Sequence, residues 1–194
     1  MHEIHSPDEL AELLLKSYTH ALSCTIAIDG KDGVGKTPLA VALQAAVGGT
    51  VISLDNFVED VRYGYIPYLR TAELKSALDR ADRPRIVEGV CVLAAMARIS
   101  HTADVLIYVK RVASDGYWHD QETCEPTEPI EDLIERIAKE VAIVARFDPE
   151  LSDEAYREDE KPALTPLREE IIRYHGLYRP SRRAEIIFLN TEER

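Results

Sequence analysis

The sequence is poor in cysteine, and none of its cysteines is placed to form a familiar cysteine site. Its 194 residues include 3 cysteines, Cys24, Cys91 and Cys124, which lie far apart and form no CxxC pair. This spacing predicts neither a disulfide framework nor a zinc site. It fits a protein kept in a reducing compartment, and we expect a cytoplasmic location.

Long apolar runs are also missing. No stretch approaches the about 18 consecutive apolar residues that a membrane-spanning helix requires. The opening segment, MHEIHSPDELAELLLKSY, carries acids where a secretion signal carries bases. We therefore expect neither secretion nor insertion into a membrane.

Basic residues are outnumbered, with 23 Lys and Arg against 35 Asp and Glu and a net charge of -12. Such a charge repels nucleic-acid backbones and anionic membranes, so we expect neither as a partner, and a homo-oligomer remains open. The 6 histidines show no HxxxH or HExxH spacing, and we interpret them as surface or packing residues.

What the sequence does contain is an alternation of short apolar strands and helical patterns. Ser6, Pro7 and Glu9 form a helix start, so we expect an N-terminal helix over 6–18. Further helices are expected at about 36–47, 71–80, 91–99, 130–146 and 166–175. Strands are expected at 24–28, 50–54, 85–87, 104–109 and 185–189.

This alternation predicts an α/β fold in which a mainly parallel five-stranded sheet is covered by helices on both faces. The length fits one domain over 1–194. Proline and acids interrupt the periodicity at 114–129 and 148–162, and we expect these two segments to be mobile surface excursions.

One motif carries a specific chemistry. Residues 30–37, GKDGVGKT, match GxxxxGK[ST], and they lie between an expected strand and an expected helix. In this phosphate-binding loop the backbone N–H groups surround an oxyanion, the lysine reaches the β and γ phosphates, and the hydroxyl ligates magnesium. The motif predicts a three-layer P-loop NTPase fold that binds ATP and Mg²⁺. The residues expected at the nucleotide are Gly30, Asp32, Gly33, Val34, Gly35, Lys36, Thr37 and Pro38.

Two acids follow other expected strands. Asp55 ends TVISLD and Glu88 ends RPRIVE, at the sheet edge where ligands bind in open parallel sheets. Asp55 could ligate the metal or accept a proton from an attacking hydroxyl, or it could simply begin a turn. Glu88 could reach the metal, or it could be a glutamate near a helix start.

Several segments together resemble the uridine kinase and phosphoribulokinase-like family of P-loop kinases. They are IDGKDGVGKT, VISLDNF, IVEGV, DVLIYV and RYHGLYRPSRRAEIIF, in the family's order and within about 22–190. The resemblance implies that Asp55 is the general base, that Thr37, Asp55 and Glu88 support magnesium, and that Lys36 and Thr37 hold the triphosphate.

The resemblance also implies an arginine-bearing lid within 111–146. LIERIAKEVA is similar to the family's lid helix, which would bring Arg136 and Lys139 to the transferring phosphoryl group. Alternatively, Arg136 with Glu140 and Glu135 with Lys139 are surface pairs along a helix. Trp118 and His119 could cover the site or pack.

The acceptor is less well defined. Tyr63, Tyr65, Tyr68 and Arg70 follow Asp55 closely and could stack on an acceptor or hold an anionic group, or they could pack a loop and pair with surface acids. The family's nucleoside-gripping hairpin has little room before IVEGV, where only DRADRP follows the expected helix.

The function expected from these features is ATP- and Mg²⁺-dependent phosphoryl transfer to a hydroxyl of a small molecule. The alternative is a nucleotide-binding regulatory module with little phosphotransfer. A third option, an NTPase coupled to a partner protein, lacks a supporting motif because no NKxD is present.

Overall fold

The computed structural model describes residues 2–18, 23–145 and 164–191. The six strands form one sheet in the order β1-β6-β5-β2-β4-β3, and every pairing is parallel. The strands are β1 (His2–Ile4), β2 (Thr25–Asp29), β3 (Thr50–Ser53), β4 (Arg85–Glu88), β5 (Val105–Val112) and β6 (Ile186–Thr191). The expected α/β class is therefore confirmed.

The expected number of five strands was wrong. The additional strand, β1, pairs with β6 from His2 opposite Ile186 to Ile4 opposite Phe188. Only Ile4 of this strand is buried, so the segment carries no alternating apolar pattern of its own. Its strand conformation depends on the edge that β6 offers from the other end of the chain.

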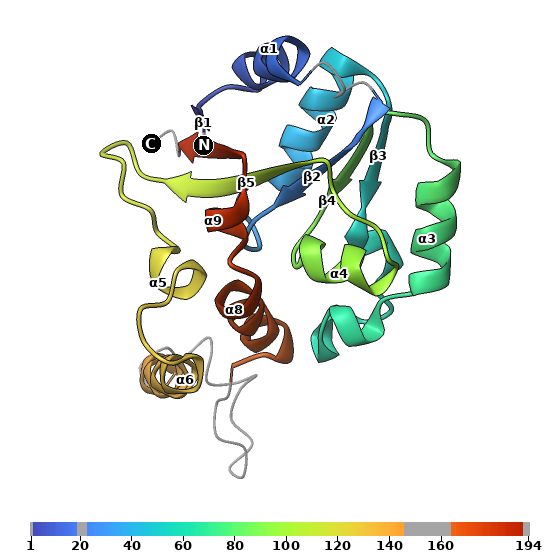
Figure 1. Ribbon diagram of the computed structural model, residues 1–194. Helices are drawn as coiled ribbons and strands as arrows, with labels where there is room; N and C mark the ends of the chain where they lie inside the picture. The colour runs from blue at the N-terminus through green and yellow to red at the C-terminus, as the bar shows by residue number, and fades with distance from the viewer. Residues whose placement is uncertain (1, 19–22, 146–163, 192–194) are drawn as a thin grey trace.

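Helices cover both faces of the sheet (Figure 1). They are α1 (Pro7–Ser17), α2 (Lys36–Val47), α3 (Thr71–Arg80), α4 (Val92–Arg98), α5 (Gln121–Cys124), α6 (Ile130–Ala145), α8 (Pro166–Tyr178) and α9 (Pro180–Arg183). Short 3-10 turns lie at η2 (Leu54–Phe57), η3 (Val61–Tyr63) and η4 (Ile66–Tyr68). As expected, Ser6 caps α1, because its hydroxyl accepts from the backbone N–H of Glu9.

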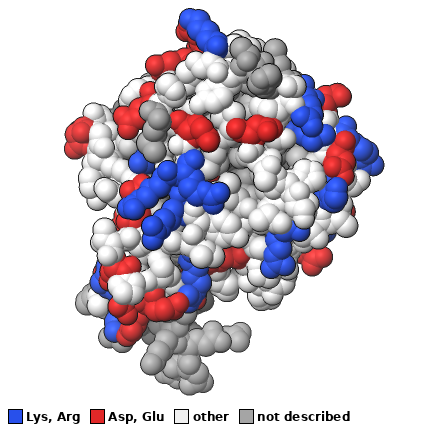
Figure 2. Space-filling view, viewed as in Figure 1, with Lys and Arg blue, Asp and Glu red and all other residues white. Residues whose placement is uncertain are grey.

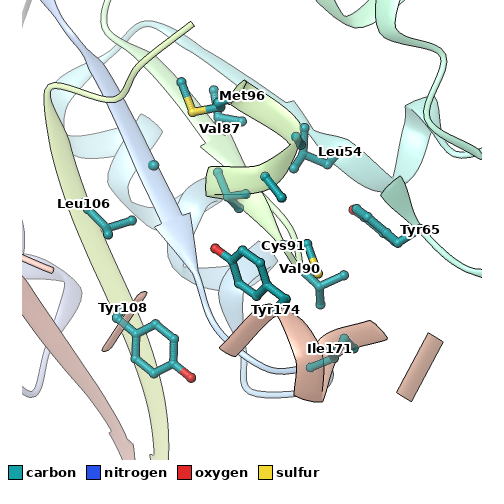
Figure 3. Packing of buried hydrophobic residues seen from close by; sticks show 14 of the residues in the cluster. Leu54, Tyr65, Val87, Val90, Cys91, Met96, Leu106, Tyr108, Ile171 and Tyr174 are labelled. Carbon is teal, nitrogen blue, oxygen red and sulfur yellow. The ribbon is translucent and has the colours of Figure 1, made fainter. Parts of the chain in front are cut away.

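The alternation along β2 separates two cores. Ile26 and Ile28 pack with α1 and α2 on one face, whereas Ala27 faces α3, α4 and α8 on the other. Figure 3 shows this second core, where Ile171 and Tyr174 of α8 lie beside Val90 and Cys91. A third, smaller cluster joins α6 to α8. The sheet thus has the predicted three-layer arrangement.

Charged side chains of both signs lie on the face that Figure 2 shows, where one group of Lys and Arg side chains lies left of the centre. No helix in the described part of the chain is both long enough and apolar enough to cross a membrane.

Candidate functional site

The phosphate-binding loop lies between β2 and α2, at the carboxyl edge of the sheet. Gly30, Gly33 and Gly35 all have positive φ. Gly35, with φ 93°, is the residue directly before α2. A Cβ on Gly35 would lie 2.5 Å from the side-chain nitrogen of Asn190. That nitrogen donates to the Val34 carbonyl at 2.9 Å and so ties the loop to β6. The φ of 93° favours glycine here, and a side chain would displace Asn190 from the Val34 carbonyl.

Lys36 is folded back against its own loop. Its Nζ donates to the Lys31 carbonyl at 2.6 Å, and the side chain is buried. Burial lowers the pKa of Lys36, while the carboxylates of Asp29, Asp32, Glu88 and Asp55 oppose that change. The amine therefore lies among acids and is held by one weak neutral acceptor, which a phosphate oxygen can replace.

The loop forms one wall of a pocket of about 310 Å³. Residues from the ends of three strands meet there, as the sheet-edge argument predicts. The lining residues are Asp32, Gly33, Gly35, Lys36, Thr37, Pro38, Asp55, Glu88 and Val90. Two predicted loop residues, Gly30 and Val34, do not line it, and the Val34 side chain is buried in the core beside α2.

Glu88 reaches this pocket from the end of β4 with only 1% of its surface exposed. Its Oε2 accepts from the Thr37 hydroxyl at 3.1 Å, but its buried Oε1 has no hydrogen-bond partner among the described residues. A buried carboxylate oxygen without a donor is costly, so this oxygen is suited to a cation or a cation-bound water.

The described residues contain no group of three or more His, Cys, Asp or Glu side chains arranged to hold a metal. Magnesium in nucleotide sites takes one or two protein oxygens and completes its shell with phosphates and water. Thr37 and Glu88 fit such a partial site. Both oxygens lie beside the loop.

Asp55 lies on η2, directly after β3, and its side chain is exposed. Its Oδ1 accepts from the Tyr65 hydroxyl at 2.6 Å. That contact involves one carboxylate oxygen, and Asp55 lines the phosphate pocket. Asp55 can therefore accept a proton from a bound hydroxyl.

The other residues expected at the acceptor have different surroundings. Tyr65 is buried, whereas Tyr63 is exposed and its ring centre lies 6.1 Å from that of Tyr68. Arg70 donates to the Asn56 carbonyl at 2.5 Å and pairs with Glu73 at 3.2 Å. None of the four lines the phosphate pocket, and Arg70 braces the turn that carries Asp55.

The expected lid arginine is bound by acids. Arg136 on α6 forms ion pairs with Glu122, with Glu128 at 2.7 Å and with Glu140 at 2.9 Å, and these acids raise its pKa. The pair of Lys139 with Glu135, at 2.5 Å, is also present. In this conformation both cations make the helix-surface pairs that the alternative interpretation expects.

The 114–129 segment is more ordered than expected. Val112 and Trp118 form a β-bridge, Trp118 is buried against Tyr108, and Lys110 lies 3.9 Å from the Trp118 ring centre. Trp118 thus packs on the core. The composition concealed this order, because prolines and acids surround the few buried side chains. The other predicted excursion, 148–162, lies outside the described residues.

Sequence reasoning missed a buried acid beneath the loop. Asp29, at the end of β2, accepts from the Gly30 N–H at 2.7 Å and from the Tyr174 hydroxyl. Burial raises the pKa of Asp29 to about 6, although both hydrogen bonds favour the ionised form. The local signal was the IDG triplet, where an acid directly precedes the first loop glycine.

A second missed contact joins the loop to the segment after β5. Lys31 pairs with Asp120 at 2.6 Å, and Asp120 is 6% exposed. The two residues are 89 positions apart, and no local pattern pairs them. The loop is therefore anchored from β6, from α8 and from the 114–129 segment.

The chain matches no protein-family model and no curated protein by sequence. Its fold is similar to a solved structure described as a possible uridine kinase from Bacillus stearothermophilus. The identity is 14% and the TM-score 0.50, over 94% of this chain and 96% of that one. At this identity the likeness shows the fold alone.

Proposed function

We propose that the protein transfers the γ-phosphoryl group of ATP, with Mg²⁺, to a hydroxyl of a small molecule. The observation that carries the proposal is the free, buried Oε1 of Glu88 beside the Thr37 hydroxyl. A purely structural acid here would be paired or replaced by an apolar residue. Its place beside a glycine-rich loop fits a cation that arrives with phosphates.

The residues divide the work as follows. The loop N–H groups and Lys36 hold the β and γ phosphates once Lys36 leaves the Lys31 carbonyl. Thr37 and Glu88 would hold a magnesium ion, which would neutralise charge on the phosphates. Asp55 accepts the proton of the attacking hydroxyl on the oxygen that Tyr65 leaves open.

The family resemblance and the solved structure described as a possible uridine kinase both support a kinase. Neither defines the acceptor of this chain. The tyrosines after Asp55 lie outside the phosphate pocket, so the acceptor class is left to experiment.

The test is ADP release from ATP and Mg²⁺ with a panel of nucleosides, sugars, sugar phosphates and vitamin precursors. Lys36→Ala serves as the blank. Acceptor-dependent release above the blank is expected, and Asp55→Ala should abolish it while ATP binding persists. Near-normal turnover by Asp55→Ala would show that Asp55 is not the base.

The second candidate is a nucleotide-binding regulatory module. It is favoured by the three carboxylates that bind Arg136 and keep its charge from a phosphoryl group in this conformation. Tight ATP binding without acceptor-dependent release would support this candidate against the kinase.

A further inference from the structure

Tyr65 occupies an unusual position for a residue on a surface segment. It is 1% exposed, whereas its neighbours Tyr63 and Tyr68 are exposed. Its hydroxyl lies 2.6 Å from Asp55 Oδ1. The phenol donates this hydrogen bond and so engages one of the two carboxylate oxygens of Asp55.

The place of this phenol depends on an acid 105 positions away. Glu170 on α8 accepts from the Tyr65 N–H at 2.6 Å and from the Ile66 N–H at 2.8 Å, one with each oxygen. A Cβ on Gly64 would lie 2.9 Å from Glu170 Oε2. Gly64, which has φ 136°, thus allows the carboxylate to approach the backbone.

The hydroxyl end of Tyr65 is fitted equally closely. A Cβ on Gly89 would lie 2.9 Å from the Tyr65 oxygen. The phenol hydroxyl therefore lies against Gly89, the residue after Glu88, where it donates to Asp55. Figure 3 shows Tyr65 beside Leu54 of η2, on the side away from Tyr108.

Helix α8, which carries Glu170, also contacts the base of the phosphate-binding loop. Tyr174, one turn after Glu170, donates to Asp29 and accepts from the Leu93 N–H at 3.2 Å. Residues four apart lie on one helix face, so α8 holds the Tyr65 segment and the base of the loop with neighbouring side chains.

We propose that Tyr65 is a positioning residue for the base Asp55, and that Glu170 fixes Tyr65 in place. The inference rests on the proposed kinase function. By donating to Oδ1, Tyr65 orients the carboxylate so that Oδ2 meets the acceptor hydroxyl. Tyr65 itself contacts neither the acceptor nor the nucleotide.

The kinetic test is Tyr65→Phe in the intact chain, with the acceptor found in the ADP-release panel. We expect kcat to fall about 10- to 100-fold, because misdirected groups cost that much in rate, while KM for ATP stays the same. Glu170→Gln should lower kcat in the same direction. Tyr18→Phe, which removes a phenol hydroxyl at the end of α1, should leave both constants unchanged.

A double-mutant cycle separates positioning from general loss of structure. If Tyr65 acts through Asp55, Tyr65→Phe should have a much smaller effect in the Asp55→Glu background, which keeps a base for turnover but displaces it from the Tyr65 hydroxyl. An equal loss in both backgrounds would overturn the role. So would an unchanged kcat for Tyr65→Phe in an active wild-type enzyme.

A measurement made without any acceptor distinguishes failure of the positioning role of Tyr65 from failure of the proposed kinase function. The carboxyl ¹³C resonance of Asp55, identified by its loss in Asp55→Asn, should move in Tyr65→Phe and stay in Tyr18→Phe. An unmoved resonance overturns the hydrogen bond itself. If the resonance moves but the wild-type protein shows no acceptor-dependent release, the proposed function fails and the positioning role fails with it.

Discussion

The buried carboxylate of Asp29 gives a prediction about stability that needs no knowledge of the acceptor. Burial raises the pKa of Asp29 to about 6 from an ordinary value of 3.8. The folded protein therefore binds a proton between pH 4 and 6 that the unfolded chain has released. Over this window the Asp29 contribution to the free energy of unfolding falls as pH rises, by about 3 kcal/mol in total.

The variant is Asp29→Asn, which removes the ionisation and keeps an oxygen for the Gly30 N–H. The hydrogen bond from Tyr174 is weakened, at a cost of about 1 kcal/mol. Above pH 7 we expect the variant to be more stable than the wild type by about 2 kcal/mol, or about 4 to 8 °C in Tm. Below pH 4 it should be less stable by about 1 kcal/mol.

The assay is urea unfolding of both proteins from pH 4 to 8. The difference between them should change by about 1.4 kcal/mol per pH unit between pH 4 and 6 and then level off. Asp104→Asn is the matched control, because exposed Asp104 also accepts a backbone N–H of β2, from Thr25 at 2.8 Å. A difference that is independent of pH, or a variant less stable at pH 7, would refute the reasoning.

Three further predictions concern the surroundings of the loop. Glu88→Gln should weaken ADP binding about 10-fold with Mg²⁺ but not with EDTA, measured by calorimetry, and an equal loss in both would contradict a metal role. Lys31→Met should lower the free energy of unfolding in urea by about 3 kcal/mol, because it leaves Asp120 buried without its cation. Asp120→Asn should lower the free energy of unfolding less, because it leaves no buried charge unpaired. Burial lowers the pKa of His175 to about 4, so its contribution to stability is lost as pH falls from 6.5 to 4. His175→Gln should remove this loss of stability, measured by unfolding from pH 6.5 to 4. An unchanged loss in the variant would contradict the role of His175.

The sheet and the phosphate pocket were predictable because their signals are local. The β-branched strands and GKDGVGKT each carry their own pattern, and parallel strands bring Asp55 and Glu88 to one edge whatever the loops do. The strand β1 was not predictable in this way. Its three residues acquire strand structure from β6, which is 184 positions later where His2 meets Ile186.

The surroundings of the three tyrosines after Asp55 could not be predicted, for a related reason. The sequence does not distinguish the three tyrosines within 63–68. Only Tyr65 of the three is buried, and Glu170 accepts a hydrogen bond from its backbone N–H. Residue type alone suggested stacking on a ligand. The contact that selects one of the three belongs to α8, and its pairing with this segment cannot be read from either segment alone.

Several departures from ordinary core chemistry in the described structure lie around the loop, and others, such as the buried Nε of Arg70 and Oγ of Ser181, lie elsewhere. Glu88 has a buried oxygen without a partner, and Asp29 is buried as an ionisable acid where an apolar residue would be more stable. Lys36 is buried with a carbonyl as its acceptor. A protein retains such costs where activity depends on them, since selection for stability alone removes them. Three such groups beside the phosphate-binding loop add to the argument from its sequence motif. The cost of burying Asp29 also explains why Asp29→Asn should stabilise the fold.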